Sequence, residues 1–145
     1  MQESMQATRR STYLQSEIEG VYHEIAQKMG LSDSAMIILY TLQMHDGACS
    51  LQTVCKRSGL TKQTVNSALR KLEREGTLYL APDGARSKRV CLTEAGKALA
   101  GRTVCRLMAA ENEIFASWTE AETKQYLALT ESYLSALREK LQTDF

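Results

Sequence analysis

Residues 50–76 read SLQTVCKRSGLTKQTVNSALRKLEREG, and this stretch decides the fold. Ser50 and Thr61 each stand at the start of a helical pattern as N-cap residues, and Gly59 and Gly76 follow the two patterns as helix ends. Two helices joined by a turn of about three residues that contains glycine form a helix-turn-helix. The sequence therefore predicts this motif near the middle of the chain.

The second of these helices combines an apolar stripe with a polar face. Val65, Leu69 and Leu72 recur at steps of four and three, which places them on one side of a helix. The other side is then free to present hydrogen-bond donors to a partner. The polar residues expected there are Lys62, Gln63, Asn66, Arg70 and Arg74.

A β-hairpin is expected directly after the helix-turn-helix. Two short strand-like runs, residues 78–80 and 89–92, flank a segment in which Pro82 precedes Asp-Gly, and these residue types favour a turn between strands. The hairpin carries three bases near its tip, Arg86, Lys88 and Arg89. A helix-turn-helix followed by such a hairpin is a winged helix.

Helical patterns with apolar stripes flank this central part on both sides. Residues 7–30 and 93–145 carry more apolar surface than a small lobe of residues 31–92 needs for its own core. We therefore expect a single mainly α domain, residues 1–145, in which a winged helix-turn-helix lobe with a small β-hairpin wing is flanked by N- and C-terminal dimerisation helices. A homodimer follows from this assignment.

The net charge of +1 hides a strong asymmetry along the chain. Residues 56–89 contain nine bases and three acids, a balance of +6, whereas the remaining residues have a balance of −5. A basic block between acidic segments is typical of a protein in which one part faces a polyanion. The alternative, which charge alone leaves open, is a solvated basic face.

Several classes of protein are disfavoured by composition and motifs. The longest apolar run, residues 35–40, is far shorter than the roughly 20 residues of a membrane-spanning helix, and the first residues lack the apolar core of a signal peptide. The four cysteines include no CxxC pair, so we expect reduced thiols and a cytoplasmic protein.

Catalytic and metal-binding patterns are also missing. Neither histidine lies in a nucleophile motif, and the sequence has no glycine-rich phosphate loop. The histidines and cysteines show no tight spacing of metal ligands. We therefore expect no enzyme, no metal and no cofactor.

Three parts of the chain together resemble a known family. They are residues 50–76, the basic hairpin that ends in Arg86-Ser-Lys-Arg-Val90, and the run Leu92-Thr-Glu-Ala-Gly96. They resemble the MarR (multiple antibiotic resistance regulator) family of bacterial transcription factors, and the flanking helices match that family in length and order. The resemblance implies a homodimer that binds a pseudopalindromic operator in double-stranded DNA, usually represses nearby genes, and often releases DNA when a small molecule or an oxidant acts on it.

Two positions depart from the family pattern. The wing tip of the family commonly reads Asp-x-Arg, whereas Asp83 and Arg86 are three apart in this chain. Either the tip is one residue longer, or Gly84 replaces the acid that orients the arginine. Leu80 stands where the family often has an arginine before the wing, which removes a contact with phosphate.

On DNA, the helix-turn-helix would divide its work between phosphates and bases. Ser50 and Thr61 lie at helix N-termini, whose free N–H groups face phosphates. The second helix would enter the major groove, where Gln63 and Asn66 are the best candidates for reading bases, since Gln and Asn pair with adenine. The residues that it would place in or beside the groove are Lys62, Gln63, Thr64, Asn66, Ser67 and Arg70. The alternative is that Ser50 and Thr61 only cap their helices.

The wing would contact the adjoining part of the duplex. Arg86 at its tip is expected to reach a narrow, A·T-rich minor groove, while Lys88 and Arg89 meet phosphates. The alternative here is that the three bases are only solvated.

The sequence offers candidates for a pocket that binds a small-molecule effector. Tyr22, His23, Met36, Tyr40 and Met44 lie on helices that would frame the cleft between the dimer seam and the lobe, and they are candidates to line a site for an aromatic or amphipathic ligand. Ordinary core packing is the alternative for each of them.

The cysteines allow a second kind of signal. Cys55 beside two bases and Cys49 near a helix start are candidates for sensing an oxidant, which requires exposure and a lowered thiol pKa. The alternative is that both are small buried apolar residues.

The leading hypothesis is therefore a dimeric, ligand-responsive DNA-binding repressor. The rival is a winged-helix module that binds an acidic protein and does not bind DNA specifically. An activator, or a regulator without any ligand, would use the same DNA surface.

Overall fold

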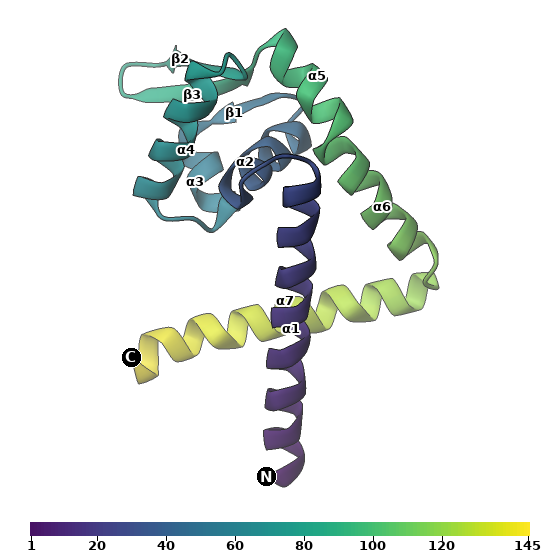
Figure 1. Ribbon diagram of the computed structural model, residues 1–145. Helices are drawn as coiled ribbons and strands as arrows, with labels where there is room; N and C mark the ends of the chain where they lie inside the picture. The colour runs from purple at the N-terminus through teal and green to yellow at the C-terminus, as the bar shows by residue number, and fades with distance from the viewer. The chain divides into compact units, whose positions relative to one another are not determined.

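The computed structural model describes residues 1–145, which form seven helices and three strands (Figure 1). Their bounds are α1 Gln2–Lys28, α2 Asp33–Met44, β1 Ala48–Ser50, α3 Leu51–Ser58, α4 Lys62–Arg74, β2 Leu78–Asp83, β3 Ser87–Leu92, α5 Glu94–Arg102, α6 Val104–Ala116 and α7 Glu120–Asp144. The chain divides into two compact units, Met1–Arg106 and Leu107–Phe145. The predicted fold class, mainly α with a small β-hairpin wing, is confirmed.

The core of the first unit is centred on α2, as its continuous apolar sequence predicts. Ile38, Leu39 and Leu42 have no exposed surface, and Ser32 caps the helix by accepting a hydrogen bond from the Ala35 N–H at 3.1 Å. Around α2 lie α3, α4 and the sheet (Figure 1). This core supports the helix-turn-helix from behind.

The sheet has one strand more than the sequence predicts. Its order is β1-β3-β2, with all pairs antiparallel, and β1 pairs with β3 through Ala48 opposite Cys91. A strand of three residues is too short to show alternation, and its last residue, Ser50, is also the N-cap of α3. The strand forms because β3 offers a free edge, which is a tertiary effect.

The start of α5 is docked tightly on the beginning of β2. Thr93 caps α5 by accepting from the Gly96 N–H at 3.0 Å, and its own hydroxyl lies 2.6 Å from the Gly76 carbonyl oxygen and 3.0 Å from that of Thr77. A Cβ atom on Gly96 would lie 1.9 Å from the Thr77 oxygen. The Leu-Thr-Glu-Ala-Gly run therefore specifies a close approach of helix and backbone.

The sequence from Thr93, a candidate N-cap, to about Phe115 predicts one long helix, but the structure divides it. Thr103 separates α5 from α6 with φ −125° and ψ −92°. Its buried hydroxyl donates to the Leu99 carbonyl at 2.6 Å, a contact one turn back that often accompanies a bend in a helix. The periodicity of the sequence continues across this point, so pattern alone did not reveal the break.

The N-terminal helix is almost entirely exposed. It begins at Gln2, within the segment that the sequence suggests is a polar tail, and Ala26 is its only buried residue. Three apolar side chains spaced along one side of this helix, Leu14, Ile18 and Val21, are 40–54% exposed.

The second unit leaves a similar stripe uncovered. Thr119 and Glu122, three positions apart, have the sequence pattern of a capping box, and this box forms at the start of α7. Thr119 accepts from the Glu122 N–H at 3.1 Å, and the Glu122 carboxylate accepts from the Thr119 N–H at 2.8 Å. These backbone and side-chain hydrogen bonds lower the pKa of Glu122. No residue of α7 is buried. None of the helices of the chain combines the length and apolar character needed to cross a membrane.

Candidate nucleic-acid interface

The two helices of the helix-turn-helix begin as the sequence predicts. The Ser50 hydroxyl accepts from the Thr53 N–H at 3.0 Å, and the Thr61 hydroxyl accepts from the Thr64 N–H at 3.2 Å. Val65, Leu69 and Leu72 of α4 are buried against the core. The remaining surface of α4 is therefore held outward by the packing of the opposite side.

One side of α4 borders a cleft of about 780 Å³ between α3, α4 and the wing, which we call the wing cleft. Five of the predicted site residues line it: Lys62, Asn66 and Arg70 from α4, and Arg86 and Lys88 from the wing. The three α4 residues are spaced by four, so they share one side of the helix. The fold thus brings together residues that are 16 or more positions apart between α4 and the wing.

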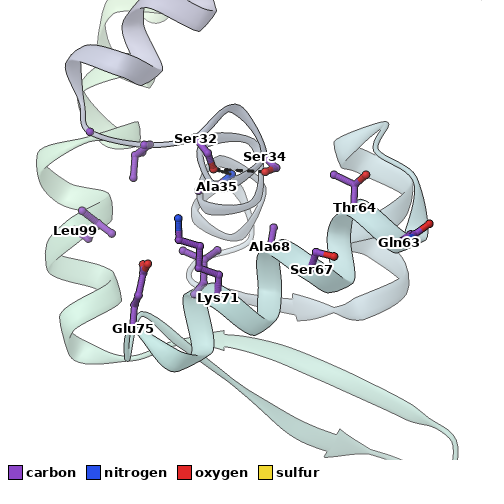
Figure 2. Close-up of a pocket in the computed structure, with 13 residues that line it drawn as sticks. Ser32, Ser34, Ala35, Gln63, Thr64, Ser67, Ala68, Lys71, Glu75 and Leu99 are labelled. Carbon is purple, nitrogen blue, oxygen red and sulfur yellow. Dashed lines mark hydrogen bonds between the residues drawn. The ribbon is translucent and has the colours of Figure 1, made fainter.

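The other side of α4 borders a second cleft, of about 500 Å³, which we call the α2 cleft. It lies between α4, the turn that precedes α2, the first residues of α2, and α5 (Figure 2). Gln63, Thr64 and Ser67 line this cleft. The six polar residues predicted for α4 are therefore divided between two sides of the helix.

The charge of this lobe is uncompensated in the structure. None of the nine bases between residues 56 and 89 takes part in a salt bridge; the four ion pairs of the chain all lie elsewhere. Of the residues that line the wing cleft, only Glu73 is acidic. The positive field of the lobe is therefore free to act on an external anion.

The geometry of the wing explains its departure from the family pattern. Asp83 and Ser87 are the last paired residues, and Gly84 turns the chain with φ +79°. The Ser87 hydroxyl donates to the Asp83 carbonyl at 2.5 Å, which closes a turn of three residues. Arg86 is exposed and forms no ion pair with Asp83, so the acid does not orient it.

Three predicted site residues line neither cleft, and one of them, Thr61, is exposed at the N-cap of α4. The other two are Arg89 and Ser50. Arg89 is exposed on β3, where it stands opposite Ser50 of β1 and Ala81 of β2 in the strand register. Ser50 is half-buried, and its hydroxyl contacts the Thr53 hydroxyl at 2.8 Å as well as the N–H. Both residues belong to the sheet side of the lobe.

The candidate effector residues differ in how deeply they are buried. Met36 is buried, Tyr22 and Tyr40 are half-buried, and His23 and Met44 are exposed. His23 Nδ1 lies 2.9 Å from both carboxylate oxygens of Asp33, which ties α1 to the start of α2. None of the five lines the wing cleft or the α2 cleft.

Among the residues of the wing cleft that sequence reasoning did not assign to the DNA interface are Gln52, Cys55 and Glu73. Gln52 and Cys55 project from α3, three positions apart, so they lie on one side of that helix. The spacing was visible in the sequence, but the contact of α3 with the wing was not. Cys55 was considered there only as an oxidant sensor.

The cysteines differ in their surroundings. All four are free thiols, and Cys49 is buried. Burial raises the pKa of the Cys49 thiol, although Arg89 acts in the opposite direction. This thiol is therefore a poor source of thiolate.

The fold and the arrangement of the clefts define a winged helix-turn-helix protein. The sequence model of the MarR family matches residues 29–88, which include α2, the helix-turn-helix and most of the wing. The resemblance to the MarR family predicted from the sequence is therefore confirmed over this segment.

Solved structures of MarR family regulators have a similar fold over nearly the whole chain. A MarR family regulator from Silicibacter pomeroyi is 27% identical over 87% of this chain and 88% of its own, with a TM-score of 0.70. One from Neisseria meningitidis is 20% identical over 97% and 99%, with a TM-score of 0.83. MepR of S. aureus, solved as a complex with DNA, is 21% identical over 90% and 96%, with a TM-score of 0.70. A search of curated protein sequences finds no significant match.

Proposed function

We propose that the chain is a transcriptional regulator that binds double-stranded DNA sequence-specifically as a homodimer and represses nearby genes in the cytoplasm. One observation carries the proposal: the polar side chains of α4 are flanked by two clefts on a lobe whose bases have no acidic partner. MepR, a protein of the same fold, forms a complex with DNA. A small molecule or an oxidant is the proposed signal for release.

In this proposal the two sides of α4 have different tasks. Lys62 and Arg70 line the wing cleft with Arg86 and Lys88, and this cluster is suited to phosphates and to the minor groove. Gln63 is exposed at the α2 cleft, whereas Asn66 is half-buried in the wing cleft. We therefore assign the main base contact to Gln63.

The proposed dimer is supported by apolar surface that the single chain does not cover. On α7, the exposed fraction of the apolar side chains is 45–65% from Tyr126 to Leu141. Large contiguous apolar patches are rare on proteins that remain monomeric. A second copy of the chain, covering the stripes of α1 and α7, accounts for both units.

The test is fluorescence anisotropy of the purified protein with duplex from its own upstream region and with a scrambled duplex, at two salt concentrations. The wild type is expected to prefer its own upstream DNA. The logarithm of its binding constant should fall linearly with the logarithm of the salt concentration, with a slope of about −0.9 for each neutralised phosphate. Arg86→Ala is expected to weaken binding. Lys124→Ala is the matched control, because Lys124 is a base on α7 paired with Glu120 at 3.1 Å.

Binding of both duplexes with equal affinity would contradict sequence-specific recognition. No binding at low salt would favour the rival function, a module that binds an acidic protein. An Arg86→Ala variant with unchanged affinity would contradict only the role of the wing tip.

A further inference from the structure

The α2 cleft contains two opposite charges that do not neutralise each other. Lys71 and Glu75 both line it, and Figure 2 shows both side chains extending from α4 toward the space between α2 and α5. They are four positions apart on one helix, a spacing at which opposite charges often pair. Neither forms a salt bridge or a side-chain hydrogen bond here.

A ligand of one charge would satisfy only half of this arrangement. A carboxylate beside the Lys71 ammonium is also close to the Glu75 carboxylate, and like charges repel. A cation meets the reverse situation. A molecule with both an ammonium and a carboxylate group pairs with each side chain.

The other residues of the cleft limit the rest of the molecule. Ser34 and Ser67 supply hydroxyl groups, while the half-buried Leu31 and Leu99 supply apolar contacts. The volume of about 500 Å³ lies within the range of small-molecule sites. An apolar body the size of one side chain fits this space.

We propose that the α2 cleft binds a small zwitterion with an apolar body, in the chemical class of a free amino acid with an aliphatic or aromatic side chain. Its ammonium group pairs with Glu75, its carboxylate with Lys71, and its side chain contacts the leucines.

Occupation of the cleft has a consequence that rests on the proposed DNA binding. Gln63, Thr64 and Ser67 line the same cleft and are also proposed to face DNA. A ligand held between α2 and α4 therefore competes with DNA for this side of the helix. Ligand and DNA are expected to weaken each other's binding by the same factor.

The experiment measures ligand binding by calorimetry on the full chain without DNA, so its result does not depend on the proposed function. Three probes are compared: L-phenylalanine, 3-phenylpropionate, which lacks the ammonium group, and phenethylamine, which lacks the carboxylate. Phenylalanine is expected to bind most tightly. Lys71→Gln and Glu75→Gln are each expected to weaken its binding about fivefold, as for a partly exposed ion pair.

Each of the two single-charge probes is expected to depend on one of the two cleft residues. Lys71→Gln weakens 3-phenylpropionate binding, and Glu75→Gln weakens phenethylamine binding. Arg74→Gln is the control, because Arg74 is an exposed base of α4 that lines neither cleft. Equal affinity for the three probes, or unchanged phenylalanine binding in both cleft variants, overturns the proposal, as does an absence of phenylalanine binding.

A second measurement separates the ligand site from its effect. Phenylalanine added to the protein–DNA anisotropy assay is expected to lower DNA affinity for the wild type and less so for Glu75→Gln. If phenylalanine binds as expected and DNA affinity does not change, competition with DNA is refuted while the ligand site stands.

Discussion

Substitution of Gly96 by alanine tests the reading of the Leu-Thr-Glu-Ala-Gly run. A Cβ atom at this position would lie 1.9 Å from the Thr77 carbonyl oxygen, 3.0 Å from its carbonyl carbon and 3.2 Å from Leu92 Cδ2. The nearest obstacle is backbone, so it cannot turn aside as a side chain does. The start of α5 must move by about 1.1 Å to bring the contact to 3.0 Å, the lower limit for Cβ atoms.

That movement strains the contacts around the Thr77 carbonyl. Its oxygen accepts from the Thr93 N–H at 3.1 Å and from the Thr93 hydroxyl at 3.0 Å. Overpacking typically costs about 1–3 kcal/mol, and each lost hydrogen bond about 1 kcal/mol. Alanine offsets about 1 kcal/mol through its higher helix propensity. The expected net loss in the free energy of unfolding is about 2–4 kcal/mol.

The assay is thermal unfolding followed by far-UV circular dichroism at a fixed protein concentration. For a chain of this size the loss corresponds to a fall in Tm of about 6–12 °C. Gly101→Ala is the matched control, because Gly101 lies on the same helix and its Cβ would meet nothing within 4 Å. The control is expected to gain up to about 1 kcal/mol. A Gly96→Ala variant that is as stable as the wild type, beside a control that behaves as expected, refutes the reasoning.

Three further predictions concern other parts of the chain. Because hydrogen bonds lower the folded pKa of Glu122, its contribution to stability is present above the usual pKa of 4.5 and is lost as pH falls through the folded pKa. The difference in free energy of unfolding between wild type and Glu122→Gln, measured by urea unfolding, should therefore shrink in acid, and a difference that stays constant with pH would contradict this prediction. Iodoacetamide should label Cys55 before Cys49, because the Cys49 thiol is buried and its pKa is raised. Peptide mass spectrometry measures the order of labelling, and faster labelling of Cys49 would be inconsistent with this prediction. Leu137→Asp should shift the protein from dimer toward monomer in light scattering, because this exposed leucine lies on the apolar stripe of α7. The control Ser135→Asp should leave the dimer intact, and a dimer unaffected by both changes would exclude this stripe from the dimer interface.

Local signals in the sequence predicted the helix starts well. The caps at Ser50, Thr61 and Thr119 are all formed in the structure by contacts within three residues. The buried stripe of α4 also follows the predicted spacing. Such features depend on neighbours along the chain, so pattern reasoning reaches them.

Features that depend on distant contacts were not predicted. The strand β1 forms on the edge of β3, about 40 residues further along the chain. The break at Thr103 occurs where a buried side chain bonds to the preceding turn, and no proline or composition change marks it. In both places the sequence pattern is compatible with more than one outcome.

The sequence by itself determined the resemblance to the MarR family, the helix-turn-helix with its wing, the basic character of the lobe and the identity of the polar residues on α4. Only the tertiary structure decided how those residues are divided: Lys62, Asn66 and Arg70 toward the wing, and Gln63, Thr64 and Ser67 toward α2. The physical reason is that each cleft is closed by an element remote in sequence. Helical periodicity states which side chains share a side of α4, whereas the packing of α2, α5 and the wing decides what each side faces.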